Sequence, residues 1–143
     1  MTFIHTTHVG SLPRTPELAA LLLKRDHGEQ IDEAAFDALV SSEIEKAIRA
    51  QVKAGVSIVS DGELGKVGYS TYVTGRLSGF GGHVDRTPAK DLADLPELRT
   101  KLAAIMGSQS FVRAACIGKV ELVDSKPVDD DIRRFKAAMA KEG

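Results

Sequence analysis

The most regular feature of the sequence is a long stretch in which apolar residues recur every three or four positions. It follows Asp32, a favourable helix-capping residue, and stops before Gly55, a residue type common just beyond helix ends. The apolar residues that keep this spacing are Phe36, Leu39, Val40, Ile44, Ala47, Ile48 and Val52. The pattern predicts an amphipathic helix from Asp32 to Ala54.

Two further helices are predicted nearer the ends of the chain. Thr15-Pro16-Glu17 combines a hydroxyl cap, a proline at the first helical position and an acid in the first turn, and this helix should end near His27-Gly28. From Ser125 to Lys141, three acids fill the first turn and one face is apolar, with Val128, Ile132, Phe135 and Met139. Shorter or less regular helices are expected over Tyr69–Leu77 and over Asp91–Met106, the latter with Pro96 in its first turns.

Apolar and β-branched stretches predict strands over Phe3–Val9, Val56–Ser60 and Phe111–Ile117, and Val120–Val123 either extends the third strand or forms a hairpin arm. Strands that alternate with helices pair in parallel. Three parallel strands do not stand alone easily, since such strands need cover on both faces. The predicted fold class is α/β: a partial (β/α)8 TIM-type barrel with its first three strands and their helices. Residues 1–143 would form a single N-terminal portion of that barrel.

Asp61 and Glu63 are the leading candidates for a site. They follow the second predicted strand, and ligand sites in parallel α/β proteins lie at the carboxyl ends of strands. Their spacing suits an acid–base pair or a metal cradle. It also suits a plainer arrangement in which Asp61 caps a turn and Glu63 is solvated.

Other motifs give weaker evidence for a functional site. His5 and His8 are three positions apart, which places them on opposite faces of a strand and argues against a shared metal. The Gly62–Lys66 stretch has too few residues between its glycines for a phosphate-binding loop. Tyr69 and Tyr72 stand at helical spacing, which favours packing over stacking on a flat substrate.

Composition narrows the class of protein. The 143 residues are 43% apolar and 27% charged, as in one soluble globular domain. With 19 basic and 20 acidic residues there is no electrostatic case for nucleic acid or for an anionic membrane. No bilayer-spanning run or signal peptide is evident. The single cysteine, Cys116, excludes an internal disulfide and is predicted to be a buried strand residue, so we expect a cytoplasmic protein.

Two motifs together resemble a known family. Thr6-Thr7-His8-Val9-Gly10-Ser11-Leu12-Pro13-Arg14 is followed by Gly55-Val56-Ser57-Ile58-Val59-Ser60-Asp61-Gly62-Glu63. The pair resembles the catalytic barrel of cobalamin-independent methionine synthase, and is closest to the short single-barrel members of that superfamily, which also includes epoxyalkane:coenzyme M transferases. The resemblance covers essentially the whole chain but only the first part of the barrel. It implies zinc-dependent transfer of a methyl group from a folate to homocysteine, without cobalamin.

The resemblance also implies roles for individual residues. Val9, Gly10 and Ser11 match the turn whose N–H groups and serine hydroxyl hold the amino acid's carboxylate, and such a turn offers donors to an anion. Glu63 matches the glutamate that binds the substrate's ammonium group. His8, Arg14 and Asp61 would support the site; methionine synthase has threonine where His8 stands, so the acceptor stays open.

The zinc ligands of the family, a His-x-Cys pair, a Glu and another Cys, come later in the barrel, and Cys116 has no histidine two residues before it. A zinc site needs three or four protein ligands. We therefore expect neither a metal ligand nor a catalytic residue in this chain, and no activity from it alone.

Several functions remain open. The chain could be the N-terminal part of a truncated or split thiol methyltransferase, or part of a related alkyl or coenzyme M-type transferase. It could also be a non-catalytic small-molecule-binding module or a remnant. The expected partners are a small thiol or amino acid and a methyl donor, with self-association through uncovered strands.

Overall fold

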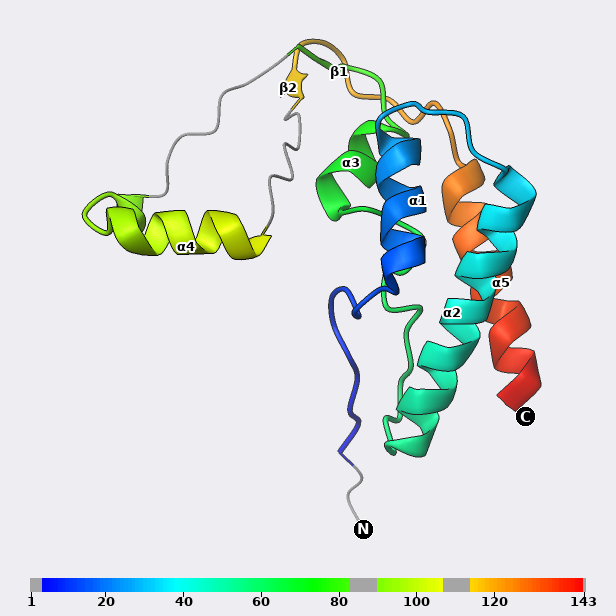
Figure 1. The fold of residues 1–143 in the computed structure, drawn as a ribbon. Helices are drawn as coiled ribbons and strands as arrows, with labels where there is room; N and C mark the ends of the chain where they lie inside the picture. The colour runs from blue at the N-terminus through cyan, green and yellow to red at the C-terminus, as the bar shows by residue number, and fades with distance from the viewer. Residues whose placement is uncertain (1–3, 83–89, 107–113, 143) are drawn as a thin grey trace. The chain divides into compact units, whose positions relative to one another are not determined.

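The computed structural model describes residues 4–82, 90–106 and 114–142 (Figure 1). The chain forms two compact units, residues 1–76 with 124–143, and residues 77–123. In the described part of the first unit the helices are α1 (Pro16–Asp26), α2 (Glu33–Lys53), α3 (Tyr69–Thr74) and α5 (Lys126–Glu142). The second unit contains β1 (Phe80–Gly81), the 3-10 helix η1 (Lys90–Leu92), α4 (Pro96–Met106) and β2 (Ala115–Cys116).

The three helices with the clearest sequence signals form within two residues of their predicted bounds. At the start of α1, the Thr15 hydroxyl accepts a hydrogen bond from the N–H of Leu18 at 3.4 Å. At the start of α2, one carboxylate oxygen of Asp32 accepts from the N–H groups of Ala34 and Ala35, both at 3.0 Å. These caps satisfy donors that would otherwise lack partners, which explains why both helices begin where the sequence predicts.

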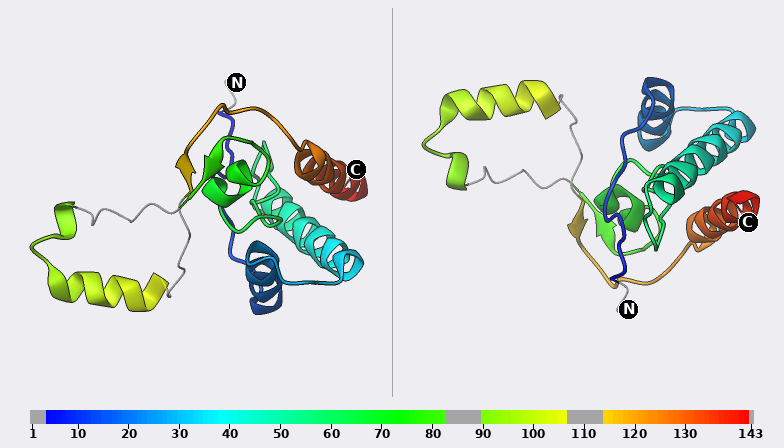
Figure 2. Two further views of the ribbon diagram at one scale, coloured as in Figure 1. Left: turned by 90° about the horizontal axis from the view of Figure 1, so that it is seen from above. Right: turned by 90° about the horizontal axis from the view of Figure 1, so that it is seen from below.

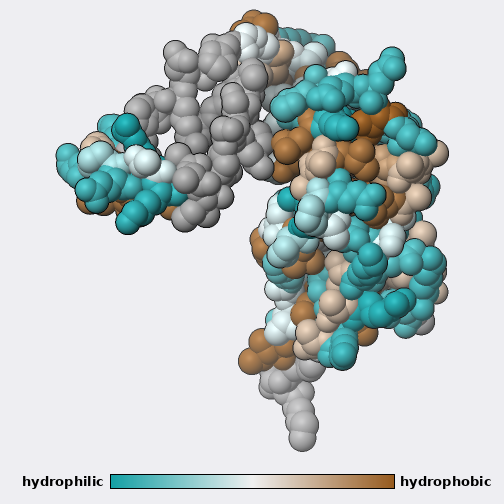
Figure 3. Space-filling model, in the orientation of Figure 1, coloured by the Kyte–Doolittle hydropathy of each residue, from teal (hydrophilic) through white to brown (hydrophobic). Residues whose placement is uncertain are grey.

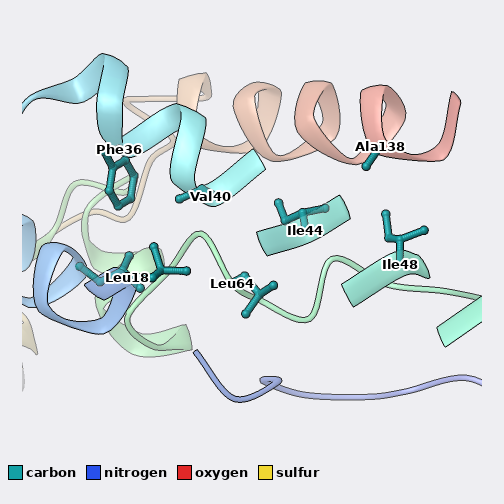
Figure 4. Close-up of a cluster of buried hydrophobic side chains, with 8 residues drawn as sticks. Leu18, Phe36, Val40, Ile44, Ile48, Leu64 and Ala138 are labelled. Carbon is teal, nitrogen blue, oxygen red and sulfur yellow. The ribbon is translucent and has the colours of Figure 1, made fainter. Parts of the chain in front are cut away.

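The core of the first unit lies where α1, α2, α5 and the turn after Gly62 meet (Figure 4). Its fully buried members include Leu18 of α1, four residues of α2 spaced three or four apart, and Leu64 of the turn; the α2 residues are Phe36, Val40, Ile44 and Ile48. Ala138 of α5 closes the cluster. Because Leu64 is 2% exposed and directly follows Glu63, this core also anchors the turn that carries Glu63.

Helices α2 and α5 lie side by side (Figure 2), and both run from the top to the bottom of the view in Figure 1. Charged pairs connect them in order along both helices, from Asp37 with Arg133 at 2.6 Å, through Glu45 with Lys141, to Arg49 with Glu142 at 3.0 Å. Helices that connect parallel strands of one sheet run in the same direction, and α2 and α5 share this relationship.

The predicted apolar face of α5 is partly wrong. Phe135 packs against the core, but Ile132 and Met139 are 46% and 37% exposed. The buried residues of α5 are instead Arg134 and Ala138. Arg134 is drawn inward by carboxylates on two elements, Asp37 of α2 and Asp131 of its own helix, and a hydrophobic pattern does not register such contacts.

The first two predicted strands appear as extended segments with a single point of pairing. Thr7 and Ile58 form an isolated parallel bridge, in which the Ile58 N–H donates to the carbonyl of Thr6 at 3.0 Å. The Thr7 hydroxyl also donates to the Ile58 carbonyl at 2.8 Å. The predicted direction of pairing is therefore present at one bridge, but neither Phe3–Val9, of which residue 3 lies outside the described part, nor Val56–Ser60 is a regular strand.

In the second unit, the prediction of a third parallel strand over Phe111–Ile117 is wrong for its described residues. Ala115–Cys116 pairs antiparallel with Phe80–Gly81, and residues 111–113 lie outside the described part. Cys116, predicted to be buried, is exposed, and it lies in a ladder of two short strands rather than in a parallel sheet. Leu122 pairs antiparallel with Leu77, which matches the hairpin arm considered for Val120–Val123.

The shorter helices also differ from prediction. Helix α3 ends at Thr74 rather than Leu77. Helix α4 begins at Pro96, and the preceding Lys90–Leu92 forms the separate 3-10 turn. Proline suits the first position of a helix because it has no N–H to satisfy, which explains why α4 starts there.

Hydrophilic residues cover much of the helical face of the first unit, with apolar residues visible between them (Figure 3). Across the described ranges, no helix combines the length and the hydrophobicity that a bilayer span requires.

Candidate functional site

The turn over Asp61–Lys66 carries the predicted carboxylate pair and is held in a specific shape. The Asp61 side chain accepts a hydrogen bond from the Glu63 N–H at 3.0 Å, and the Ser60 hydroxyl accepts from the Gly62 N–H at 3.3 Å. Gly62 and Glu63 both have left-handed backbones, with φ of 62° and 54°. Asp61 therefore does cap a turn, as the plainer alternative proposed, and Glu63 lies beyond that cap.

The segment before α1 holds this turn from the other side. The Leu12 N–H donates to the Gly62 carbonyl at 2.9 Å. A Cβ on Gly62 would lie 2.6 Å from Leu12 Cδ1 and 2.9 Å from its Cβ and Cγ. Glycine at this position thus permits both the left-handed backbone and the close approach of Leu12.

Ser11 and Glu63 meet although 52 residues separate them in the sequence. The Ser11 hydroxyl donates to the Glu63 carboxylate at 2.7 Å. Ser11 is exposed and Glu63 half-buried, so both polar groups are open to solvent. The structure thus brings together the two side chains that the sequence places in one site, and the contact is charge-assisted.

The predicted anion turn is accessible. Val9 is 87% exposed, and Gly10 has φ of 96° with open space where a Cβ would stand. The backbone N–H groups of Gly10 and Ser11 donate to none of the residues that the structure describes. The ring Nε2 of His8 lies 3.0 Å from the Gly10 carbonyl, so His8 supports the turn rather than facing Glu63.

The side chain of Arg14 contacts the backbone of the same turn. Its Nη2 donates to the carbonyls of Glu63 at 2.8 Å and of Lys66 at 2.6 Å. Burial lowers the pKa of the Arg14 guanidinium, while the charge of Glu63 acts in the opposite direction. Arg14 therefore contacts the turn that carries Glu63 through backbone carbonyls.

Sequence reasoning did not find the polar cluster on the far side of the turn. Lys66 Nζ lies 3.1 Å from the carboxylate of Asp131 on α5 and 3.8 Å from that of Asp61, and all three side chains are at most 20% exposed. The Tyr72 hydroxyl donates to Asp131 at 2.9 Å. A Cβ on Gly65 would lie 3.1 Å from Asp131, so glycine permits this approach of α5. Asp131 was predicted only as a charge at a helix N-terminus, and no local signal indicates its distant partners.

The cluster changes the chemistry of Tyr72. Burial, followed by the hydrogen bond to Asp131 and the charge of that residue, raises the pKa of Tyr72 to about 12. The Tyr72 ring contacts two cations, with Lys66 Nζ and the Arg76 guanidinium carbon each 4.5 Å from its centre. Tyr72 therefore packs within the protein, as predicted, whereas Tyr69 is 77% exposed.

A cavity of about 640 Å³ lies beside this cluster, between α1, α3 and α5, and does not include Ser11 or Glu63. Its cations are Arg25, Lys66, Arg76, Lys126 and Arg134, and its carboxylates are Asp26, Glu33, Asp124, Asp130 and Asp131. Most of these cations already pair with carboxylates. The balanced lining does not select a ligand of either charge, so the candidate site stays at the Ser11–Glu63 contact.

The described residues do not fit a zinc centre. A catalytic zinc needs three protein ligands and an open position. Within residues 4–82, 90–106 and 114–142, no three His, Cys, Asp or Glu side chains gather closely enough to hold a metal ion. No chemical step is therefore assigned to a metal held by these residues.

Comparison with known proteins agrees with the motifs at this site. Residues 3–91 match the family described as the catalytic domain of cobalamin-independent synthase, and this range includes Ser11, Arg14 and Glu63. Because the match covers more than half of the chain, the chain belongs to that family.

Individual relatives carry one name, 5-methyltetrahydropteroyltriglutamate–homocysteine methyltransferase. The protein from Synechococcus sp. (strain JA-2-3B'a(2-13)) is 35% identical over 75 residues, which are 52% of this chain and 10% of the relative. That from Bifidobacterium longum subsp. infantis is 31% identical over 80 residues, 56% of this chain and 10% of the relative. That from Thermotoga maritima is 31% identical over 75 residues, with 52% and 10% covered. The match thus spans about a tenth of the length of these relatives.

Proposed function

We propose that Gly10, Ser11 and Glu63 bind the amino-acid substrate of a thiol methyl transfer, with homocysteine as the acceptor. The observation that carries the proposal is the 2.7 Å hydrogen bond between Ser11 and Glu63 at the end of two paired segments. The names of the relatives support homocysteine as the acceptor and a methyltetrahydropteroyl compound as the donor.

The two charges of an amino acid suit the two halves of the site. The N–H groups of Gly10 and Ser11 suit the carboxylate, because oriented donors in a turn attract an anion. The Glu63 carboxylate suits the ammonium group, and a charge-assisted hydrogen bond of this kind contributes about 1.5–3 kcal/mol. In this proposal the chain binds and orients the amino acid, while no described residue is assigned to activate its thiol.

We also propose that the chain forms the N-terminal portion of a (β/α)8 barrel, with residues 4–9 and 56–60 in the places of the first two strands. The parallel bridge between Thr7 and Ile58 supports this arrangement, as do the parallel directions of α2 and α5. A single bridge between exposed segments also fits self-association, since Ile4 and Ile58 are 82% and 55% exposed.

Calorimetric titration of the chain with homocysteine tests the substrate assignment. We expect Glu63→Gln to weaken binding by about tenfold or more, because the amide carries no charge for the ammonium group. Glu29→Gln, which changes an exposed glutamate on the loop before α2, serves as the matched control and should leave the affinity unchanged. Equal affinity for the wild-type and Glu63→Gln chains would remove Glu63 from the site.

A further inference from the structure

Glu63 is unusual among the described residues, because it is the non-glycine residue with a left-handed backbone, at φ of 54°. An L-residue meets a steric penalty in this region, and such residues persist where the surrounding structure holds them. The N–H, carbonyl and carboxylate groups of Glu63 each have a hydrogen-bond partner. Asp61 accepts from its N–H, Ser11 donates to its carboxylate, and Arg14 donates to its carbonyl.

Of these three partners, Arg14 is the one that contacts two backbone carbonyls of the turn. The same Nη2 donates to the carbonyls of Glu63 and Lys66, three positions apart in the turn, and the Lys66 N–H also donates to the Glu63 carbonyl at 3.4 Å. Asp61 lies within the turn itself and Ser11 contacts only the side chain of Glu63, so neither of them connects Glu63 to Lys66 from outside the turn.

The buried position of Arg14 also carries an energetic cost. Its Nε is buried and has no hydrogen-bond partner among the described residues. A buried donor without a partner is uncommon in folded proteins and is destabilising. The guanidinium nevertheless occupies this position with its Nη2 on the turn.

We propose that Arg14 is a positioning residue that fixes the left-handed backbone of Glu63, and thereby the place of the carboxylate that receives the ligand's ammonium group. The inference rests on the proposed function of Ser11 and Glu63. Arg14 acts from behind the turn through carbonyl oxygens and does not touch the ligand.

The effect of Arg14 on the backbone conformation of Glu63 can be measured without a ligand. In the isotopically labelled full chain, a left-handed residue gives a strong nuclear Overhauser effect between its own amide and α protons. Arg14→Met keeps an unbranched apolar side chain but removes the donors, and we expect Glu63 to lose this signal. Arg14→Lys, which retains a donor for the carbonyls, should keep it. Arg25→Met, the same change on α1, should also keep it. A persistent signal in Arg14→Met would overturn the proposal.

Measurements of homocysteine binding then test whether the backbone conformation of Glu63 affects the ligand. We expect Arg14→Met to weaken homocysteine binding by about tenfold, in line with the loss of one charge-assisted contact at Glu63. If Arg14 acts through Glu63, the double variant Arg14→Met/Glu63→Gln should bind no more weakly than Glu63→Gln alone. Additive losses would show that Arg14 acts independently of Glu63 and would overturn the proposal.

The proposed function has its own test in the same titration. 4-Mercaptobutanoate has the thiol and carboxylate of homocysteine but no ammonium group. If the wild-type chain binds both compounds equally, the assignment of Glu63 to an ammonium group fails. The nuclear Overhauser signal of Glu63 still decides in that case whether Arg14 holds the turn.

Discussion

The side-chain amide of Gln51 makes two hydrogen bonds to the backbone of Ser60, of the kind that a neighbouring strand would make. The Ser60 N–H donates to the Gln51 side-chain oxygen at 3.0 Å, and the Gln51 amide nitrogen donates to the Ser60 carbonyl at 2.8 Å. Gln51 lies in the last turn of α2 and is 7% exposed. The end of α2 thus sets the position of the residue that leads into Asp61 and Glu63.

Replacement of Gln51 by leucine should destabilise the protein. The substitution keeps a similar volume but leaves the N–H and carbonyl of Ser60 without partners, at a cost of about 1–3 kcal/mol in the free energy of unfolding. Urea unfolding followed by circular dichroism measures this loss. Gln30→Leu, the same change in an exposed loop, should stay within about 0.5 kcal/mol of the wild type. A wild-type unfolding midpoint for Gln51→Leu would show that water replaces both bonds.

Gly62→Ala should destabilise the protein more than the same change at Gly28. Both glycines have left-handed backbones, but a Cβ at Gly28 meets open space, whereas at Gly62 it would lie 2.6–2.9 Å from Leu12 side-chain atoms. The left-handed backbone alone costs about 1–2 kcal/mol, and overpacking adds about 1–3 kcal/mol at Gly62 only. Thermal or urea unfolding of the two variants compares these costs directly. Equal losses would indicate that Leu12 moves aside freely.

Deprotonation of Tyr72 should destabilise the fold at high pH. Its pKa in the folded protein is raised to about 12 by burial and by Asp131, from an ordinary value of 10.0. A raised folded pKa means that the contribution to stability is fully present below about pH 10 and is lost as the pH rises towards 12. NMR of 13C-labelled tyrosine, assigned with Tyr72→Phe, follows the titration. Asp131→Asn should lower the pKa of Tyr72 towards 10, and an unchanged titration would contradict the role of Asp131.

The parts of the fold that sequence could predict are those with local causes. Thr15 and Asp32 cap the helices that follow them, and both caps form as the sequence indicates. The meeting of Ser11 and Glu63 was also predictable, although it is distant in sequence. Two extended segments that flank α1 and α2 pair in parallel, which brings the residues after them to the same edge.

The parts that sequence could not predict depend on distant partners. The strand expected over Phe111–Ile117 was placed by its composition, but its described residues pair with Phe80–Gly81 in a glycine-rich stretch that has no strand pattern. Cys116 consequently lies in a two-stranded ladder and is exposed. The inner face of α5 was misassigned because Arg134 is buried by its ion pairs, and a periodic pattern records only hydrophobicity.

Asp37→Asn should destabilise the protein near neutral pH, and the difference from the wild type should shrink in acid. One carboxylate oxygen of Asp37 accepts from Arg134 Nε at 2.8 Å and from Arg133 Nη2 at 2.6 Å. Burial raises the pKa of Asp37, but the hydrogen bonds from both arginines outweigh it, so the pKa lies below its ordinary value. A lowered folded pKa means that the contribution is present above about pH 4 and is lost as the pH falls further.

The magnitude follows from the surroundings of the pair. Removing one partner of a fully buried ion pair costs about 3–5 kcal/mol. Asp37 is 36% exposed, and Arg134 keeps Asp131 at 3.3 Å, so a loss of about 1 kcal/mol is expected here. Urea unfolding of the wild type, Asp37→Asn and the control Asp26→Asn at pH 7 and pH 3 measures the difference at each pH. Since Asp26 is an exposed residue at the end of α1, its variant should match the wild type at pH 7. A deficit for Asp37→Asn that stays the same at both pH values would mean that the carboxylate stabilises the fold by packing rather than by its charge.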